Sequence, residues 1–237
     1  MLKIVLAGQK GGVGKSTISW LLINAALAAS DETTALLIET DHQGSSAMYH
    51  RRVMQKYPDL HTRFQCKIAH DESSLLAAFE QAEADAIDYI IIDTAGQHEE
   101  LTRFALSVAD RVIIPFRPSV KEYESQLATV TLYIQLRDAL QAKGVAAPKA
   151  ALLLNDWAQN TRLTNRQKTI LNTIHEDEML ADFYIPARNG YDTLDQGVIF
   201  IRELQEENVV SNPFVRKALQ TDLRIAGSTL RSIEALQ

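Results

Sequence analysis

Residues 8–17 read Gly-Gln-Lys-Gly-Gly-Val-Gly-Lys-Ser-Thr, a glycine-rich segment with the residue types that bind phosphate. Its glycines let the backbone pass close to phosphate oxygens and point successive N–H groups at them. A helix that begins near Ser16 would add the positive end of its dipole. In such a phosphate loop we expect Lys15 to reach the β- and γ-phosphates of a nucleotide and the Ser16 hydroxyl to bind Mg²⁺.

A second lysine, Lys10, stands ahead of the usual one and distinguishes this segment from an ordinary phosphate loop. The strict pattern also has a glycine at position 9, where this chain has Gln9. A cation beside the phosphates can neutralise charge that develops there during phosphoryl transfer, as an arginine finger does. We interpret Lys10 as a charge meant for somewhere other than the loop's own bound nucleotide. The alternative is a solvated surface lysine.

A carboxylate ends the apolar run at 88–93. This residue, Asp93, precedes Thr94-Ala95-Gly96. An aspartate that ends a strand downstream of a phosphate loop has the Walker B arrangement and would hold Mg²⁺ directly or through water. Gly96 would offer its N–H near the γ-phosphate, which predicts that 94–98 is a loop that senses hydrolysis. A turn residue or helix cap is the plain alternative for Asp93.

Predicted strands alternate with predicted helices along the chain. Strands are expected at 2–8, 34–39, 63–69, 88–93, 111–116, 149–155 and 182–186, and helices at 16–29, 71–84, 119–143, 161–181 and 213–236. Three of the strands contain continuously apolar triplets, which are typical of parallel strands covered on both faces. The alternation predicts an α/β fold with a doubly wound, mostly parallel sheet that binds ligands at the carboxyl ends of its strands.

Composition narrows the class of protein. With 237 residues, 26.5 kDa and no low-complexity tract, we expect a single domain over 1–237. The lone cysteine, Cys66, excludes an intrachain disulfide framework and a cysteine cluster for a metal. The net charge of −6 argues against a uniformly basic nucleic-acid binder, but a local basic patch stays possible. No segment reads as a signal peptide or a membrane span, so we expect a cytoplasmic protein.

The string from Gln9 to Thr17 resembles the deviant Walker A box of the ParA/MinD ATPases, and Gln ahead of the first lysine is typical of their ParA type. In that family the first lysine crosses a dimer interface and contacts the partner's nucleotide, so that ATP holds two subunits together. The resemblance therefore implies a P-loop NTPase of the deviant Walker A type, with ATP and Mg²⁺ as cofactors. It also implies that Lys10 and Lys15 are catalytic.

The segment Asp41-His42-Gln43-Gly44-Ser45 resembles the family's D-P-Q-G segment, with His42 in place of proline. In the family that aspartate positions or activates the attacking water, which makes Asp41 the third predicted catalytic residue. A carboxylate suits this task, because phosphoryl transfer to water needs an oriented nucleophile more than an early deprotonation. Glu39 is a further departure, since many relatives carry aspartate there.

The resemblance also implies base-binding residues. Asn155 ends a predicted strand where P-loop relatives place an asparagine that reads adenine, although a turn residue is the alternative. Residues 186–188 resemble the segment that walls the base. Residues 115–119 resemble a proline-containing segment near the dimer interface of small ParA proteins such as ParF, with a plain stiff turn as the alternative. The predicted nucleotide-binding residues are Gly11, Gly12, Val13, Gly14, Lys15, Ser16, Thr17, Gly96, Asn155, Pro186 and Arg188. The predicted metal ligands are Ser16 and Asp93.

The family implies an ATPase that is weak unless stimulated and that dimerises with ATP. Such a protein binds nonspecific DNA in the ATP state and partitions plasmid or chromosomal DNA with a ParB-type or ParG-type centromere-binding partner. We expect it to be nucleoid-associated and, because the loop begins at residue 8, to lack an N-terminal helix-turn-helix domain. Residues 211–237 hold two acidic residues and the four basic candidates for a DNA patch, Arg216, Lys217, Arg224 and Arg231; the alternative is a solvated face.

Two other function classes share this fold. One is a MinD-like or cargo-positioning ATPase that acts at a membrane or on a protein complex. The tail at 227–237 is short, weakly charged and without aromatic residues, which argues against membrane binding. The other is a metabolic P-loop enzyme of the dethiobiotin synthetase type, which needs a dedicated substrate pocket and fits the Lys10 signature less well.

Overall fold

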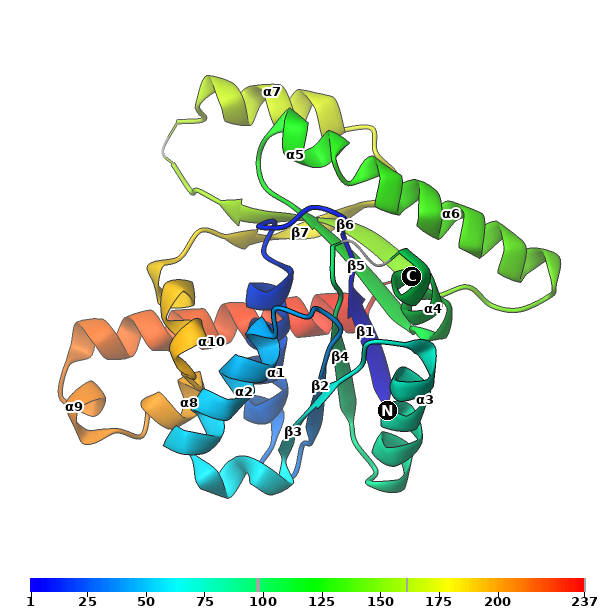
Figure 1. Ribbon diagram of the computed structural model, residues 1–237. Helices are drawn as coiled ribbons and strands as arrows, with labels where there is room; N and C mark the ends of the chain where they lie inside the picture. Colours follow the sequence, from blue (N-terminus) through cyan, green and yellow to red (C-terminus); the bar gives the residue numbers. More distant parts are fainter. Residues whose placement is uncertain (97–98, 161, 237) are drawn as a thin grey trace.

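The computed structural model of the chain describes residues 1–96, 99–160 and 162–236. Its strands are β1 (Leu2–Leu6), β2 (Ala35–Glu39), β3 (Phe64–Ile68), β4 (Tyr89–Asp93), β5 (Arg111–Phe116), β6 (Lys149–Trp157) and β7 (Leu180–Pro186). They form one seven-stranded parallel sheet in the order β3-β2-β4-β1-β5-β6-β7 (Figure 1). The predicted doubly wound α/β fold is therefore confirmed.

Helices cover both faces of this sheet (Figure 1). One face packs against α1 (Lys15–Ala29), α2 (Ser45–Lys56), η1 (Pro58–Thr62), η2 (Asn189–Gln196), α8 (Phe200–Glu203) and α10 (Pro213–Glu234). The other face packs against α3 (Glu72–Ala84), α4 (Glu99–Val108), α5 (Val120–Glu124), α6 (Leu127–Ala142) and α7 (Asn165–Ile174). A short helix, α9 (Glu207–Val210), precedes α10. Because β1 has β4 on one side and β5 on the other, the chain winds in both directions from it, and a crevice is expected at its carboxyl end.

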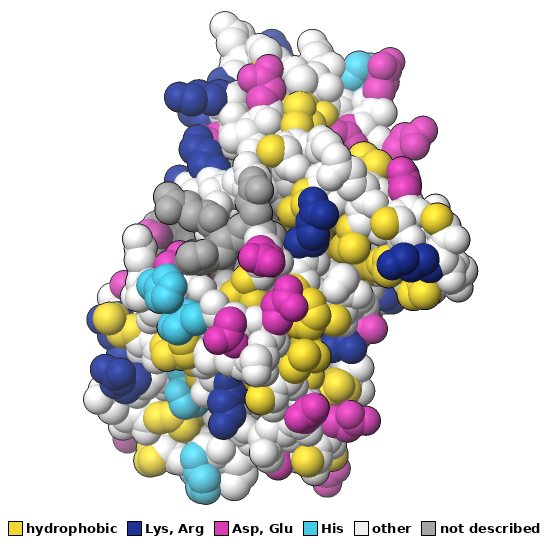
Figure 2. Space-filling view, turned by 45° about the vertical axis from the view of Figure 1, so that its right-hand side comes forward, with side chains coloured by type: hydrophobic (Ala, Val, Ile, Leu, Met, Phe, Trp, Pro, Cys, Tyr) yellow, Lys and Arg dark blue, Asp and Glu magenta, His cyan; other side chains and the backbone are white. Residues whose placement is uncertain are grey.

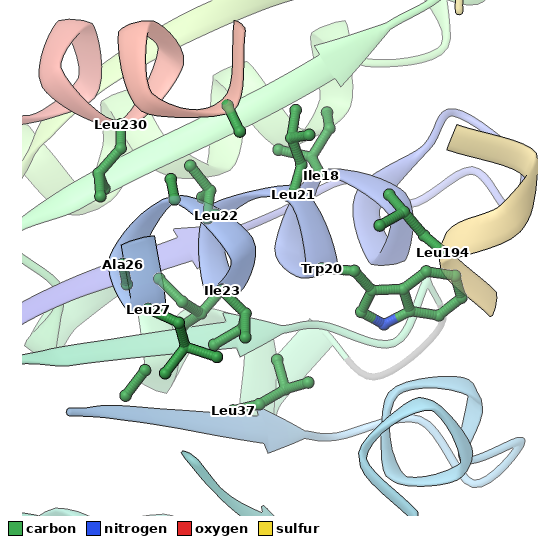
Figure 3. Close-up of a cluster of buried hydrophobic side chains, with 14 of the residues drawn as sticks. Ile18, Trp20, Leu21, Leu22, Ile23, Ala26, Leu27, Leu37, Leu194 and Leu230 are labelled. Atoms are coloured by element: carbon green, nitrogen blue, oxygen red, sulfur yellow. The ribbon is translucent and has the colours of Figure 1, made fainter. Parts of the chain in front are cut away.

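Helix α1 is apolar around its whole circumference and is buried along almost all of its length. Figure 3 shows its side chains pointing in several directions, with Leu37 of β2, Leu194 of η2 and Leu230 of α10 among their neighbours. A helix that is hydrophobic on all sides is stable in water only when it is covered on all sides. The burial of α1 therefore fixes where its first turn, and the phosphate loop before it, lie relative to the sheet.

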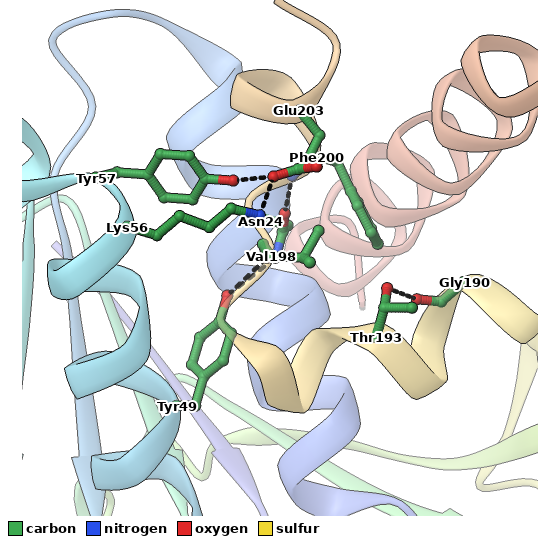
Figure 4. Close-up of polar contacts among 9 residues, drawn as sticks. All are labelled: Asn24, Tyr49, Lys56, Tyr57, Gly190, Thr193, Val198, Phe200 and Glu203. Atoms are coloured by element: carbon green, nitrogen blue, oxygen red, sulfur yellow. Dashed lines mark hydrogen bonds and ion pairs between the residues drawn. The ribbon is translucent and has the colours of Figure 1, made fainter. Parts of the chain in front are cut away.

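A buried polar residue of α1, Asn24, fixes the segment that leads into α8 (Figure 4). Its Oδ1 accepts a hydrogen bond from the Phe200 N–H at 2.7 Å, and its Nδ2 donates to the Tyr49 hydroxyl at 3.1 Å and to the Val198 carbonyl at 3.4 Å. Burying a side-chain amide is costly unless its hydrogen bonds are made, so these contacts favour one arrangement of α1, α2 and α8.

Two predicted helices differ from the structure. The region 119–143 forms two helices, α5 and α6, because the chain turns at Ser125 and Gln126, where the Ser125 hydroxyl donates to the Glu122 carbonyl at 2.6 Å. The prediction of helix over 161–181 is wrong at its end, since α7 stops at Ile174. The Asp177 carboxylate accepts from the Met179 N–H at 2.9 Å in a turn, and β7 follows from residue 180; residue 161 lies outside the described residues.

Within the described part of the chain, no helix is long and apolar enough to cross a membrane.

Candidate nucleotide site

The glycine-rich loop lies between β1 and α1, at the carboxyl edge of the sheet. Gly12 and Gly14 have φ angles of 80° and 99°, a region that side-chain-bearing residues rarely adopt. Gly14 is also crowded, because a Cβ there would lie 2.2 Å from Asn155 Nδ2. That amide donates a hydrogen bond to the Val13 carbonyl at 2.9 Å and so fixes the loop. Asn155 thus supports the loop, and its role in reading a base stays a prediction.

Lys15 is folded back onto the loop that it follows. Only 8% of the residue is exposed. Its ammonium group donates to the Gly8 carbonyl at 2.9 Å and to the Lys10 carbonyl at 3.2 Å. Burial lowers the pKa of Lys15, and the nearby carboxylates, above all Asp93, oppose that shift. A buried cation that holds only carbonyl oxygens is suited to exchange them for phosphate oxygens.

Asp93 ends β4 and is 2% exposed. Burial raises the pKa of its carboxyl group, while hydrogen bonds from Ser16 and Ser46 and the charge of Lys15 oppose the shift. The Ser16 hydroxyl also lies 3.2 Å from the Ser45 hydroxyl. A buried carboxylate beside hydroxyl oxygens is a ligand set that suits Mg²⁺, and a divalent cation would favour the charged form of Asp93. The residues present therefore fit the predicted metal.

Asp41 lies in the loop after β2. Its backbone N–H donates to Glu39 Oε1 at 2.9 Å, and its own Oδ1 accepts from the Gln43 N–H at 2.9 Å. The next residue, His42, stacks on the ring of His70 with 4.1 Å between the ring centroids. This stacking supports the loop at the position where the related segment has proline.

A cavity of about 280 Å³ brings most of the predicted residues together. It is lined by residues of the phosphate loop and of the strand ends around it: Gly11, Gly12, Gly14, Lys15, Ser16, Thr17, Asp41, Gln43, Ser45, Asp93, Thr94 and Arg117. Val13 is buried beneath the loop. Gly96 lies against the loop from outside, because a Cβ there would be 2.5 Å from the Gln9 carbonyl oxygen; residues 97 and 98 of the predicted sensing loop lie outside the described residues.

Lys10 does not line this cavity. Its ammonium group forms an ion pair with the Glu122 carboxylate of α5, and both side chains are partly exposed. The second lysine is therefore held within its own chain, beside the phosphate loop.

Pro186 and Arg188 also lie outside the cavity. Pro186 ends β7, and Arg188 Nε donates to Asp222 Oδ1 of α10 at 2.7 Å. Arg188 and Asp222 line a separate groove of about 650 Å³ between η2 and α10. The contact of Pro186 and Arg188 with a base stays a prediction.

Sequence reasoning missed several residues of the site. Arg117 lies in the segment 115–119 and Gln43 in the segment 41–45, and neither residue was assigned a role from the sequence, although both follow strands of the parallel sheet. Ser46 and Glu122 make contacts with distant parts of the chain. The Glu39 carboxylate contacts the nearby backbone of Asp41 and Ser46. Among these missed residues, Glu39 alone carried a signal in the sequence, because it departs from the aspartate of many relatives.

The glycine loop, the buried Lys15 and the strand-end Asp93 on a parallel sheet define a P-loop nucleotide-binding protein, and the second lysine of the loop, Lys10, makes it one of the deviant Walker A type. Solved structures share the fold. An ATP complex of a McdA variant from Cyanothece superposes with a TM-score of 0.60 at 16% identity, covering 96% of each chain. A plasmid partition protein from Borrelia burgdorferi has a TM-score of 0.54 at 20% identity over 85% of this chain and 98% of that one.

A family model described as VirC1 protein matches residues 1–236, and the chain belongs to the VirC1 family. One curated relative, protein virC1 of Rhizobium rhizogenes, is 27% identical over 244 residues, which cover 100% of this chain and 97% of the relative. The predicted membership among ParA/MinD-like proteins of the deviant Walker A type is thereby confirmed.

Gly14→Ala tests the loop geometry. Alanine at a φ of 99° is strained and its Cβ would displace Asn155, so we expect the free energy of unfolding to fall by about 1–3 kcal/mol and ATP binding to be lost. The control for stability alone is Gly11→Ala, since a Cβ at Gly11 meets nothing within 4 Å and its backbone lies outside the left-handed region, whereas Gly11 itself lines the cavity. Denaturant unfolding and titration with a fluorescent ATP analogue measure both effects. Equal stability of the two variants would contradict this geometry.

Proposed function

We propose that the chain is an ATP-dependent dimerising switch of the ParA type that binds nonspecific DNA in its ATP state and hydrolyses ATP slowly. The observation that carries the proposal is the phosphate-loop cavity, in which Lys15, Asp41 and Asp93 converge while Lys10 stands beside it. The likeness of the fold to a plasmid partition protein and to an ATP-bound McdA supports the same conclusion. We also propose that residues 1–237 act as one domain.

The chain's own residues supply the parts that phosphoryl transfer to water needs. Lys15 exchanges its two carbonyl partners for phosphate oxygens, and the loop N–H groups hold the remaining oxygens. Ser16 and Asp93 would hold Mg²⁺, which neutralises phosphate charge when bound. Asp41, held by its backbone hydrogen bond to Glu39, orients the attacking water.

Lys10 links the chemistry to dimerisation. In the single chain its charge is paired with Glu122. To contact the nucleotide of a second subunit it must leave this carboxylate, and the phosphates of a bound ATP supply a stronger negative partner. ATP would therefore stabilise the dimer, and the dimer would in turn bind ATP more tightly.

Helix α10 supplies the basic surface for DNA. Its acidic residues face inward, since Asp222 is 1% exposed beside Arg188 and Glu234 accepts from the Tyr89 hydroxyl at 2.6 Å. Its basic residues Arg216, Lys217, Arg224 and Arg231 are exposed. By contrast, the face in Figure 2 mixes both signs of charge. Three of the cations recur every seven residues, about 10 Å apart along one face of the helix, which suits contacts with a phosphate backbone.

A partition role requires further components. We propose that a ParB-type or ParG-type centromere-binding protein stimulates hydrolysis and that the protein works on the nucleoid in the cytoplasm. The dimer would double the α10 surface, so that affinity for DNA depends on the nucleotide state.

DNA binding in the presence of ATP, of ADP and of no nucleotide tests the proposed function. We expect wild-type protein to bind a random-sequence duplex at least about tenfold more tightly with ATP than with ADP, and Lys10→Ala to lose this difference because its dimer does not form. Fluorescence anisotropy of a labelled duplex measures the affinity. Lys143→Ala, which removes an exposed lysine at the end of α6, is the control. Equal wild-type affinity in all three conditions would rule out the proposal.

Glu122→Gln tests the pairing of Lys10. Removing the carboxylate charge frees the ammonium group, so we expect the ATP concentration for half-maximal dimerisation to fall about two- to fivefold, as the loss of a partly exposed ion pair allows. Glu124→Gln removes the same charge from an exposed position of the same helix and should leave that concentration unchanged. Sedimentation velocity over an ATP series measures it, and identical curves for both variants would contradict a role for Glu122.

A further inference from the structure

Ser46, in the first turn of α2, connects three elements of the site and is fully buried. Its backbone N–H donates to Glu39 Oε2 at 2.7 Å, and its hydroxyl donates to Asp93 Oδ2 at 2.7 Å. The same hydroxyl accepts from Trp20 Nε1 at 3.0 Å. An indole N–H can only donate, so it fixes the direction of both hydrogen bonds: Trp20 donates to the Ser46 hydroxyl, and that hydroxyl donates to Asp93.

Glu39, at the end of β2, is also fully buried and closes the loop between Asp41 and Ser46. One carboxylate oxygen accepts from the Asp41 N–H at 2.9 Å and the other from the Ser46 N–H at 2.7 Å. One side chain therefore holds both ends of the segment that carries the water-orienting aspartate. Burial and the charge of Asp93 raise the pKa of Glu39 to about 7, and the hydrogen bonds from the Asp41 and Ser46 N–H groups oppose this rise.

We infer that Glu39 and Ser46 are positioning residues that connect Asp41 and Asp93 through one hydrogen-bond network. Trp20 of α1 joins this network through its hydrogen bond to Ser46. The inference rests on the proposed function, because it assigns the two aspartates to water and to the metal. Loss of the Ser46 hydroxyl would leave the Asp93 carboxylate and the Trp20 N–H without this partner inside the protein. The arrangement also makes Trp20, one hydrogen bond from Ser46, a reporter of what binds at Asp93.

Steady-state ATPase kinetics of Ser46→Ala and Ser46→Thr give the first test. We expect Ser46→Ala to lower kcat at least about tenfold while KM for ATP stays within about threefold, because the phosphate loop itself is unchanged. Ser46→Thr keeps a hydroxyl and should recover most of kcat. Ser228→Ala, an exposed serine of α10 whose hydroxyl bonds only to the Ile225 carbonyl among the described contacts, is the matched control.

Tryptophan fluorescence gives a second test that does not depend on hydrolysis. The chain has two tryptophans, so Trp157→Phe leaves Trp20 as the reporter. In that background we expect Mg²⁺ with ADP to change the emission of Trp20, and we expect Ser46→Ala to abolish the change while ADP still binds. A wild-type kcat in Ser46→Ala, or an unaltered Trp20 response in it, would overturn the inference. If the wild-type protein binds ATP without hydrolysing it, the proposed function is wrong. The fluorescence comparison would still test the positioning role of Ser46, because it does not depend on hydrolysis.

Discussion

The burial of α1 along almost all of its length is the constraint on which the rest of the structure depends. A helix that is apolar on every side needs the sheet beneath it and α2, η2 and α10 around it. Once it is enclosed, its first turn can lie only at the carboxyl edge of β1, where the strand order reverses. Two glycines in the left-handed region then turn the loop over that edge. The core of the protein thus sets the position of its phosphate site.

Several charged side chains lie close together at the phosphate loop, most of them buried. Three carboxylates, on Glu39, Asp41 and Asp93, influence the pKa of the buried ammonium group of Lys15. Such a cluster is unfavourable unless hydrogen bonds or cations compensate it. Ser46 and the backbone N–H groups of the loop after β2 provide the hydrogen bonds, and a nucleotide with its metal would complete the charge balance. Stability and ligand binding are therefore expected to be linked in this protein.

Much of this arrangement could be predicted from the sequence, because it depends on local patterns. Apolar patterns predicted all seven strands, three of them from continuously apolar triplets. The position of Asp93 at the end of one of these strands predicted its place beside Ser16. The contacts of Lys10 and Ser46 could not be predicted, since they join residues 112 and 47 positions apart. The end of α7 was missed for another reason: the acidic turn at Asp177 stops a helix that the apolar spacing alone would continue.

We propose that a second copy of this chain completes the nucleotide site. The most direct measurement is the mass of the Asp41→Ala protein in solution by light scattering, because that variant should keep the ATP state from decaying. We expect the 26.5 kDa monomer with ADP and about twice that mass with ATP and Mg²⁺. A monomer with either nucleotide, at protein concentrations where ATP is bound, would contradict it.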